Sequence, residues 1–486
     1  MATFIIPAAG RATRLRPITS NVSKAMVTVG GKPTIAHVLD HIGVGHEVII
    51  VEGQFDDLRN FVKPRYPYVK FVQQDVQRGE LDAAAVGLGV AKGKGPVVIW
   101  NGDTIVEDEF EYDVDGPLVQ DVEDQSPWLM TDGKQFFDKP TSNIGPGFAA
   151  CVGVFRFKDA AKLRNACALS FSGGCYNIIG AFNLYRPEDK RWQIDHVERW
   201  YDVGNLDNYH RARAELMTNT GRSFNDISVD TYYNTVTKVG RTLEASDKID
   251  AEALWYTSLR GKQRLFAPQL INHEHGMIVL SLEPGTTVAE LLLYHDLPVR
   301  SWVTILSKIF DVMHEVFYEP FLPWPDSLEY MWIDKNVERV KEYAPEFIPF
   351  VERVGRELVE SAHYSRTIHG DLATHNVLYD AFTGKLTLID PRGSFLRVGT
   401  EGDQQYDICK LWEDIYWGLT QNLAGRRTVV IDPIVPLEQL TKQYGYDVDL
   451  MKAGGLLLLL TAVPFHEDNP LAQQTFIDTA RRTILD

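Results

Sequence analysis

Positive charge is concentrated in one stretch near the start of the chain, FIIPAAGRATRLRPITSNVSKAM (residues 4–26). Its apolar start ends in a glycine, and Arg11, Arg14 and Arg16 follow before Lys24. Like charges on one loop repel each other unless an anion neutralises them. Arginine forks, a lysine ammonium and the N–H groups of a glycine loop all suit phosphate oxygens. The stretch therefore predicts a site for a phosphate-rich ligand.

A second ordered set of polar residues lies in the C-terminal half. The segment IHGDLATHNVLYD (368–380) places His369, Asp371 and Asn376 in the spacing H-x-D-x-x-x-x-N. A hairpin-like AFTGKLT follows, and then LIDPRG, which contains Asp390. This set is the candidate site of the second half.

The composition limits the classes of function. The chain has 486 residues, 44% of them hydrophobic, which predicts two to three globular domains. Its 49 basic and 66 acidic side chains give a net charge of −17, which argues against non-specific binding to nucleic acid or to anionic membranes. Four cysteines without CxxC spacing favour a reduced, cytoplasmic protein.

Two apolar segments bear on whether the chain enters a membrane or is exported. No basic region precedes the apolar N-terminal stretch, so we expect no secretory signal. The run GGLLLLLTAV (454–463) is shorter than the ~20 residues that span a bilayer, so we expect a buried helix and no membrane insertion. The oligomeric state stays open, a homo-oligomer included.

The elements that position the first site alternate between strands and helices. Candidate strands are TFIIPA, EVIIVEG, KFVQQD, GPVVIWNGD and ACVGVFRF, and candidate helices are TIAHVLDHI and LDAAAVGLGVA. This alternation predicts an α/β fold with a doubly wound, mostly parallel, Rossmann-like sheet. In such sheets ligands bind beyond the carboxyl ends of the strands, where the loops after IIPA and VVIWNGD would lie.

The order of elements changes beyond a polar, turn-rich segment. We expect a first domain over 1–217, a linker over 218–226 and a second domain over 227–486. Strand-like SVDTYYNTVTKVG and MIVLSLEPG surround a helical stretch, and long helical patterns follow. The second domain is therefore expected to be a bilobal α+β domain, with a small lobe at about 227–285 and a helical lobe at about 286–486.

The opening stretch resembles the signature of the sugar-phosphate nucleotidylyltransferase family, G-x-G-T-R-L-x-P-x-T-x-x-x-P-K. Four further segments match that family in order across roughly 1–217: QQDVQRGELDAA, VVIWNGDTIV, FDKP and RWYDVGNLDNYHRA. The resemblance implies transfer of a nucleotide from a nucleoside triphosphate to a phosphate monoester, with release of pyrophosphate. Such transfers depend mainly on positioning and charge neutralisation.

The resemblance also implies roles for individual residues. Arg14 would hold the leaving pyrophosphate and Lys24 the reacting phosphates, both as catalytic residues. Lys139 would bind the phosphate of the second substrate, while Asp103 and Asp202 would hold Mg²⁺. The implied nucleotide-binding positions are Ala9, Gly10, Arg14, Gln74 and Gly79, and the last two favour a pyrimidine.

Three positions depart from the family pattern. Ala12 stands where the signature has its second glycine, Ser23 replaces a proline, and Asn205 replaces a threonine. Alanine adds a Cβ where the backbone should approach the triphosphate, and it disfavours a positive φ.

The second set resembles the aminoglycoside phosphotransferase and choline kinase superfamily. The resemblance implies that Asp371 is the base or orienting residue for a substrate hydroxyl, and that Asn376 and Asp390 hold Mg²⁺ on the phosphates of ATP. Lys238, on a predicted strand, and Glu252, on the next helix, would form the ion pair that positions ATP.

Other positions follow from the same resemblance. Asp407 would brace the catalytic loop, LSLEPGTT (280–287) would be the hinge, and GRSFND (221–226) would replace a glycine-rich loop. Arg392 is open to two interpretations, an anion clamp for the substrate or a partner of a local carboxylate. The aromatic and acidic segment LWEDIYWGL (411–419) is expected to be core packing.

Together the two resemblances indicate a bifunctional enzyme with Mg²⁺ as cofactor and with ATP and a second NTP as substrates. The C-terminal half would phosphorylate a small sugar or alcohol, and the N-terminal half would activate the product for cell-surface polysaccharide. Amino-sugar activation with UTP and activation of choline, ethanolamine or glycerol with CTP stay open. So do a single-function kinase with a degenerate regulatory N-terminal domain and a non-catalytic nucleotide sensor.

Overall fold

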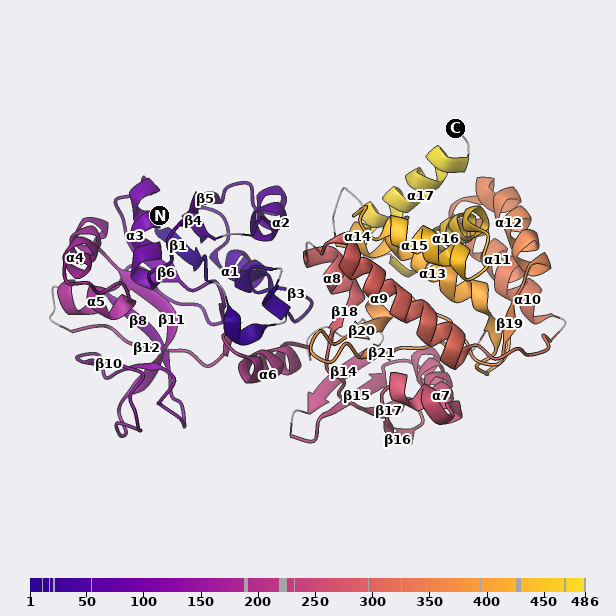
Figure 1. Ribbon diagram of the computed structural model, residues 1–486, viewed down its shortest axis with the longest axis horizontal. Helices are drawn as coiled ribbons and strands as arrows, with labels where there is room; N and C mark the ends of the chain where they lie inside the picture. The colour runs from indigo at the N-terminus through magenta and orange to yellow at the C-terminus, as the bar shows by residue number, and fades with distance from the viewer. Residues whose placement is uncertain are drawn as a thin grey trace. The chain divides into compact units, whose positions relative to one another are not determined.

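The computed structural model describes the chain except residues 11, 17, 21, 54, 188–190, 218–224, 231, 296, 325, 394, 425–429, 467–468 and 485–486. It divides into two compact units, residues 1–216 and 217–486, which are unit 1 and unit 2 below (Figure 1). Most of the expected linker, and most of GRSFND, lies outside the described residues.

The sheet of unit 1 is built on four parallel strands, as the alternating pattern predicts. These are β1 (Thr3–Ala8), β4 (Glu47–Glu52), β5 (Lys70–Gln73) and β6 (Val97–Trp100). Their order is β6-β1-β4-β5, and the interior strands β1, β4 and β6 are almost wholly buried. Parallel strands with both faces covered read as continuous apolar runs, which is why IIPA, VIIV and VVIW stand out in the sequence.

Further strands extend this sheet beyond β6, and all of them pair antiparallel except β12, which runs parallel to β8. The long strand β11 (Ala149–Phe157) pairs with β6, and the remaining strands are β8 (Gly116–Gln120), β9 (Leu129–Thr131), β10 (Phe136–Asp138) and β12 (Asp195–His196). The helices of unit 1 are α1 (Thr34–Ile42), α2 (Asp57–Arg65), α3 (Glu80–Val90), α4 (Ala160–Ser172), α5 (Ile178–Leu184) and α6 (Leu206–Met217). The sheet is thus mixed but mainly parallel around β1.

Two short pairs of strands lie apart from this sheet. Strand β7 (Thr104–Val106) pairs antiparallel with β13 (Trp200–Asp202), and β2 (Thr28–Val29) with β3 (Lys32–Pro33). Apolar side chains from the loop after β1, from β7 and from α6 form a buried cluster of their own, including Leu15, Ile105 and Leu216. The loop after β1 is therefore anchored to the β7–β13 pair.

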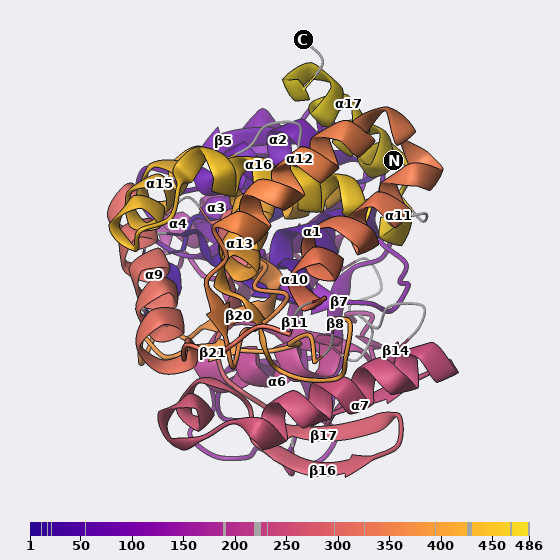
Figure 2. The ribbon, with the colours of Figure 1, turned by 90° about the vertical axis from the view of Figure 1, so that its right-hand side faces the viewer.

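Unit 2 begins with a four-stranded antiparallel sheet and one long helix beside it (Figure 2). The strands, in the order β14-β15-β17-β16, are β14 (Asn225–Asp230), β15 (Thr235–Gly240), β17 (Met277–Ser281) and β16 (Leu270–Glu274), and the helix is α7 (Leu243–Ser258). The side chain of Thr242 accepts a hydrogen bond from Ala245 N at 3.1 Å, which caps α7.

The rest of unit 2 is mainly helical. The longer helices are α8 (Val288–Tyr294), α9 (Val299–Val312), α11 (Lys335–Tyr343), α12 (Ile348–Glu360), α13 (Gln404–Ile415), α15 (Ile434–Gln443), α16 (Val448–Ala462) and α17 (Pro470–Ile484). Shorter elements are α10 (Ser327–Glu329), α14 (Leu419–Leu423), β18 (Thr286–Thr287), β19 (Tyr364–Ser365), β20 (Val377–Tyr379), β21 (Leu386–Leu388) and β22 (Gly402–Asp403).

The leucine-rich run lies in α16, as expected of a core helix. Residues 448–466 form the one helix among the described residues that is long and apolar enough to cross a membrane. Leu456, Leu457 and Leu459 are at most 1% exposed, and α16 packs against α12 and α13. Trp412 and Ile415 of α13 are fully buried in the same core, in agreement with the packing interpretation of LWEDIYWGL.

Candidate functional sites

The loop that follows β1 takes a left-handed turn. Ala9 and Gly10 come directly after β1, and the neighbouring loop approaches so closely that a Cβ on Gly53 would lie 2.8 Å from the Ala9 carbonyl oxygen. Ala12 has φ 44° and ψ 42°, and its carbonyl accepts hydrogen bonds from Thr19 Oγ1 and Leu15 N. The alanine therefore occupies a backbone conformation that favours glycine, as the family pattern predicts.

Two aspartates distant in sequence meet because β7 and β13 pair. The register places Asp202 opposite Thr104, and Val203 N donates to the Asp103 carbonyl at 2.9 Å. The carboxylate of Asp103 forms an ion pair with Lys24. One oxygen of Asp202 accepts hydrogen bonds from Gly204 N at 3.1 Å and Asn208 Nδ2 at 2.5 Å. The structure thus brings together Lys24 and the two expected metal ligands.

Two cavities meet at this cluster. One, of about 440 Å³, runs from the loop after β1 towards Gln74 and Gly79. The other, of about 390 Å³, is lined by Lys139, Trp128 and Asp202. Residues that line both are Arg14, Lys24, Gly79, Glu80, Asn101, Asp103 and Gly204. The site therefore consists of two adjoining chambers, and both cationic and acidic side chains line the region where they meet.

The first chamber contains the positions expected to bind the nucleotide. Gln74 is buried, and its Nε2 donates to Asp82 at 2.9 Å, so its amide has a set orientation. Gly79 precedes α3, and a Cβ there would lie 2.3 Å from the Tyr176 carbonyl oxygen. Leu81 N donates to that same carbonyl at 3.0 Å, so the start of α3 requires glycine for steric reasons.

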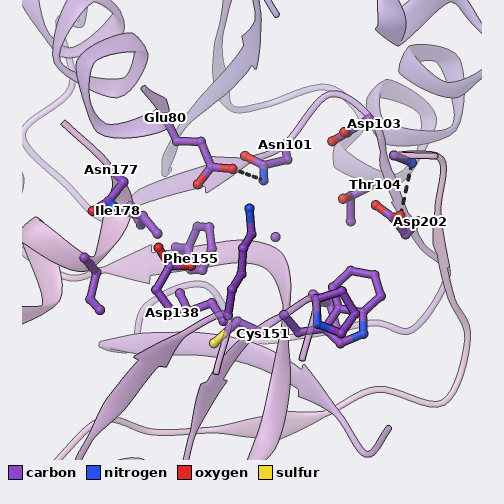
Figure 3. Close-up of a pocket in the computed structure, with 18 of the residues that line it drawn as sticks. Glu80, Asn101, Asp103, Thr104, Asp138, Cys151, Phe155, Asn177, Ile178 and Asp202 are labelled. Carbon is purple, nitrogen blue, oxygen red and sulfur yellow. Dashed lines mark hydrogen bonds between the residues drawn. The ribbon is translucent and has the colours of Figure 1, made fainter. Parts of the chain in front are cut away.

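The second chamber contains Lys139 and several residues that sequence reasoning missed. Figure 3 shows the carboxylates of Glu80, Asp103 and Asp202 around this chamber, with Asp138 and Cys151 across from them. Glu80 accepts a hydrogen bond from Asn101 Nδ2 at 3.0 Å, and the rings of Trp128 and Trp200 meet edge to face at 4.8 Å. Glu80 directly follows Gly79, and that adjacency was the available signal.

The electrostatics of the junction suit a bound cation. Burial, and next the charge of Asp103, raise the pKa of the Asp202 carboxyl above its ordinary value. Burial and Asp103 likewise raise the pKa of Glu80. Carboxylate oxygens are the ligands that Mg²⁺ takes, and a divalent cation would relieve the repulsion between the two aspartates. Asp103 and Asp202 therefore fit the expected metal.

In unit 2 a lysine lies between two carboxylates. Lys238, on β15, contacts Glu252 of α7 at 2.6 Å and also pairs with Asp390. Burial opposes the charge of Lys238, but Asp390 and Glu252 raise its pKa, so it remains an ammonium. Asp390 has a positive φ of 56°, and its backbone N–H donates to the Tyr256 hydroxyl at 3.3 Å. Three expected site residues thus form one cluster.

Asp371 and Asn376 are joined by a hydrogen bond. Asn376 Nδ2 donates to Asp371 Oδ2 at 3.0 Å, which leaves the side-chain amide oxygen of Asn376 as the atom that could bind the expected metal. Lys410 Nζ lies 3.1 Å from the other oxygen of Asp371 and 2.5 Å from Glu413. Burial would raise the pKa of Asp371, but the Lys410 ammonium holds it well below its usual range. Lys410, which lies one helical turn after Asp407, was not among the residues expected from the sequence.

Asp407 braces the loop that carries Asp371. Its two carboxylate oxygens accept hydrogen bonds from His369 N at 2.9 Å and Gly370 N at 2.7 Å. Trp255 Nε1 of α7 donates to the Ile368 carbonyl at 2.8 Å. Burial raises the pKa of Asp407 to about 7. The expected hinge, 280–287, joins β17 to β18, and Arg392 lies over the Phe395 ring at 4.6 Å.

Comparisons with known proteins concern the N-terminal part. Residues 3–116 match the family model described as nucleotidyl transferase. A bifunctional protein GlmU of Methanocaldococcus jannaschii is 32% identical over 111 residues, which cover 22% of this chain and 26% of that protein. An N-acetylmuramate alpha-1-phosphate uridylyltransferase of Caulobacter vibrioides is 30% identical over 172 residues, which cover 33% of this chain and 69% of that protein.

One similar solved structure is that of a putative glucose-1-phosphate thymidylyltransferase from Bacillus anthracis. The alignment has a TM-score of 0.39 and 21% identity, and it covers 46% of this chain and 98% of that one. On the sequence matches, the N-terminal part of this chain belongs to the nucleotidyl transferase family. The chain spans about a quarter of the length of the GlmU relatives that it matches.

Proposed function

We propose that unit 1 transfers a nucleotide from a nucleoside triphosphate to a phosphate monoester and releases pyrophosphate. The observation that carries this proposal is the junction of two chambers at Arg14, Lys24 and Asp103. A transfer reaction needs donor and acceptor in adjoining sites with the reacting phosphorus between them. The two chambers offer that arrangement, and the cationic side chains of Arg14 and Lys24 lie where the chambers meet.

The residues of unit 1 take complementary parts in this proposal. Arg14 holds the departing pyrophosphate by charge-assisted hydrogen bonds, and Lys24 neutralises the reacting phosphates. Lys139 binds the acceptor phosphate in the second chamber. Asp103 and Asp202 would hold Mg²⁺, which would supply further neutralisation of phosphate charge. The attacking phosphate oxygen forms a bond to the α-phosphorus as the bond to pyrophosphate breaks.

The substrates of unit 1 are narrowed by two observations. The orientation of Gln74 by Asp82 supports recognition of a base edge in the first chamber. The Caulobacter relative carries the name of a uridylyltransferase acting on a sugar 1-phosphate, so UTP with sugar 1-phosphates is the first combination to test. CTP with phosphorylated alcohols is the second.

Pyrophosphate release tests this part of the proposal. The full chain is assayed with Mg²⁺, each NTP and a panel of phosphate monoesters. Asp103→Asn should lower the rate roughly 100-fold or more, because a metal ligand and a charge partner of Lys24 are lost. The exposed Asp113→Asn serves as matched control and should leave the rate unchanged. Equal rates in both variants would contradict the assignment.

The proposal for unit 2 is phosphoryl transfer from ATP to a small sugar or alcohol. It rests on Lys238 bridging Glu252 and Asp390, a lysine between a helix carboxylate and a candidate metal ligand. Lys238 holds the phosphates of ATP, and Asp371 accepts the proton of the substrate hydroxyl. Asn376 and Asp390 would hold Mg²⁺, which would supply neutralisation of phosphate charge. The hydroxyl oxygen bonds to the γ-phosphorus as the bridge to ADP breaks.

ADP formation tests the second part. A pool of sugars, amino sugars and alcohols is offered with ATP and Mg²⁺, and ADP is measured with and without the pool. Asp371→Asn should abolish the pool-dependent ADP. If pool-dependent ADP persists at the wild-type rate in Asp371→Asn, the base lies elsewhere and the assignment is wrong.

In this proposal the two reactions are successive steps. Unit 2 makes a phosphate monoester, and unit 1 consumes one. The activated product would serve cell-surface polysaccharide synthesis, such as capsule or lipopolysaccharide, in the cytoplasm.

A single-function kinase with a regulatory N-terminal domain is the second candidate. The strained backbone at Ala12, where the family has glycine, favours it. In that case unit 1 would bind an NTP without releasing pyrophosphate from any acceptor, and the NTP would alter the rate of ADP formation.

A further inference from the structure

Several cationic side chains gather around Lys335 in unit 2, in the neighbourhood of Asp371. Lys335 and Arg339 lie one turn apart on α11, so both project from the same side of that helix. Arg392 follows Asp390 in the loop after β21, and Lys410 lies on α13. The charges of Arg392, Arg339, Lys410 and Asp371 all act on Lys335, so these residues share one neighbourhood.

Lys335 is the least expected member of this group. It is 4% exposed, and its ammonium donates to the Tyr406 hydroxyl at 3.3 Å. It also lies over two rings, 4.7 Å from the centre of Tyr406 and 5.1 Å from that of Phe395. No carboxylate of the described residues lies within ion-pair distance of it. A buried ammonium without a carboxylate is costly, and ring faces offset only part of that cost.

Two carboxylates of this neighbourhood are engaged by Lys410. Lys410 pairs with Asp371 at 3.1 Å and with the fully buried Glu413 at 2.5 Å. Arg392 shares the Phe395 ring with Lys335, since it lies 4.6 Å from the ring centre. Burial, and then Arg392 and Arg339, lower the pKa of Lys335 well below its ordinary value. A bound anion would offset the repulsion among these cationic side chains.

We propose that the hydroxyl substrate of unit 2 carries an anionic group, a carboxylate or a phosphate, which Lys335, Arg339 and Arg392 bind beside Asp371. The inference rests on the phosphoryl transfer proposed for unit 2 and names the class of its acceptor. The hydroxyl oxygen forms a bond to the γ-phosphorus of ATP, the bond from that phosphorus to ADP breaks, and the hydroxyl proton passes to Asp371. The anionic group of the acceptor is unchanged and serves only for recognition.

A matched set of acceptors tests the charge requirement. Glycerol, D-glycerate, glycerol 3-phosphate and choline, and likewise glucose, glucuronate, glucose 6-phosphate and glucosamine, are offered to the full chain with ATP and Mg²⁺. An anionic member of a set should give the highest kcat/KM, at least about tenfold above its neutral and cationic counterparts. The carboxylate and phosphate members separate the two sources of charge. A neutral or cationic acceptor that reacts best overturns the inference.

Lys335→Met tests the residue. It keeps the apolar length of the side chain but removes the ammonium, and it should raise KM for the anionic acceptor about tenfold or more without changing KM for ATP. Arg339→Gln should act in the same direction. Lys341→Met, exposed on the same helix, is the matched control. If Lys335→Met folds and leaves the acceptor KM unchanged, the inference is wrong.

A binding measurement separates this inference from the kinase proposal. In an Arg14→Gln, Lys139→Met background, which removes phosphate ligands of unit 1, titration calorimetry measures binding of glycerol 3-phosphate. Binding that Lys335→Met abolishes supports the anion site even where no ADP forms, and then only the kinase proposal fails. Binding that is absent, or unaffected by Lys335→Met, overturns the anion site even where ADP forms with other acceptors.

Discussion

At the scale of single residues, both candidate sites depend on lysines that are held by neighbouring carboxylates. Lys24 pairs with Asp103 in unit 1, and Lys238 pairs with Glu252 and Asp390 in unit 2. Each lysine is thus oriented before any phosphate arrives, which lowers the cost of ordering it on binding. The carboxylates that hold the lysines are also the expected metal ligands Asp103 and Asp390.

Ala12 gives the sharpest prediction at this scale. A left-handed conformation costs an L-residue roughly 1–2 kcal/mol, and the greater backbone entropy of glycine offsets part of the gain. Ala12→Gly should therefore stabilise unit 1 by about 1 kcal/mol, as measured by calorimetric unfolding of the full chain. Ala168→Gly, at an exposed site inside α4, should instead destabilise it by a similar amount. A destabilised Ala12→Gly variant would contradict the reading of this turn.

At the scale of elements, the sequence predicts the main strands well and the pairing of the small ones poorly. Strands β1, β4 and β6 are long apolar runs, so their place in the sheet and the loops after them follow from burial alone. Asp103, three residues after the end of β6, was therefore placed correctly at a strand end. The pairing of β7 with β13, which brings Asp202 to Asp103, joins segments about a hundred residues apart and has no local signature.

The roles of residues that depend on tertiary contacts could not be predicted from the sequence either. Lys410 and Lys335 lie in ordinary helical patterns, and their role depends on which loop packs against those helices. Glu80 sits at the first position of α3, where an acidic residue is a common helix-start feature. That Glu80 lines the second chamber follows only from the packing of β11 and of the loop that contains Asn101.

The start of α3 provides a prediction for this element. A Cβ at Gly79 would collide with the Tyr176 backbone, so Gly79→Ala should displace the start of α3 and raise KM for the NTP at least about tenfold. Gly89, in the same helix, has no atom within 4 Å of the position a Cβ would occupy. Gly89→Ala should leave KM unchanged and stabilise unit 1 by about 1 kcal/mol. Steady-state kinetics with calorimetry measures both effects, and equal kinetics in the two variants would refute the steric argument.

Asp407, which holds the Asp371 loop by two hydrogen bonds, should make the stability of the folded chain depend on pH. The folded pKa of Asp407, about 7, lies above the unfolded value near 3.9, so the folded chain binds this proton more tightly. The contribution of Asp407 to stability is therefore greatest at low pH and falls as pH rises from about 4 through 7. Asp407→Asn removes the titration, so the stability of wild type relative to the variant should drop by about 3 kcal/mol between pH 5 and pH 8.

Calorimetric unfolding of the full chain and of the variant, at pH steps across that interval, measures this difference. A difference that stays constant, or that grows with pH, would show that the carboxyl is ionised throughout.

At the scale of the whole molecule, two compact units each gather an ammonium, carboxylates and candidate phosphate ligands. One unit belongs to a nucleotidyl transferase family, and the proposed reaction of the other supplies the kind of acceptor that this family consumes. The central claim is therefore a two-step activity on one chain, phosphorylation followed by nucleotidyl transfer. Variants at the two aspartates should stop the sequence at different points.

Mass spectrometry of the products of the full chain tests that claim most directly. Wild type, Asp371→Asn and Asp103→Asn are incubated with Mg²⁺, ATP, one further NTP and pooled anionic, neutral and cationic alcohols and sugars. We expect wild type to yield a nucleotide-linked form of one phosphorylated pool member. Asp103→Asn should accumulate the phosphorylated member alone, and Asp371→Asn should yield neither product until that phosphorylated member is supplied. A phosphorylated product without a nucleotide adduct under every NTP, in wild type, would contradict the two-step account.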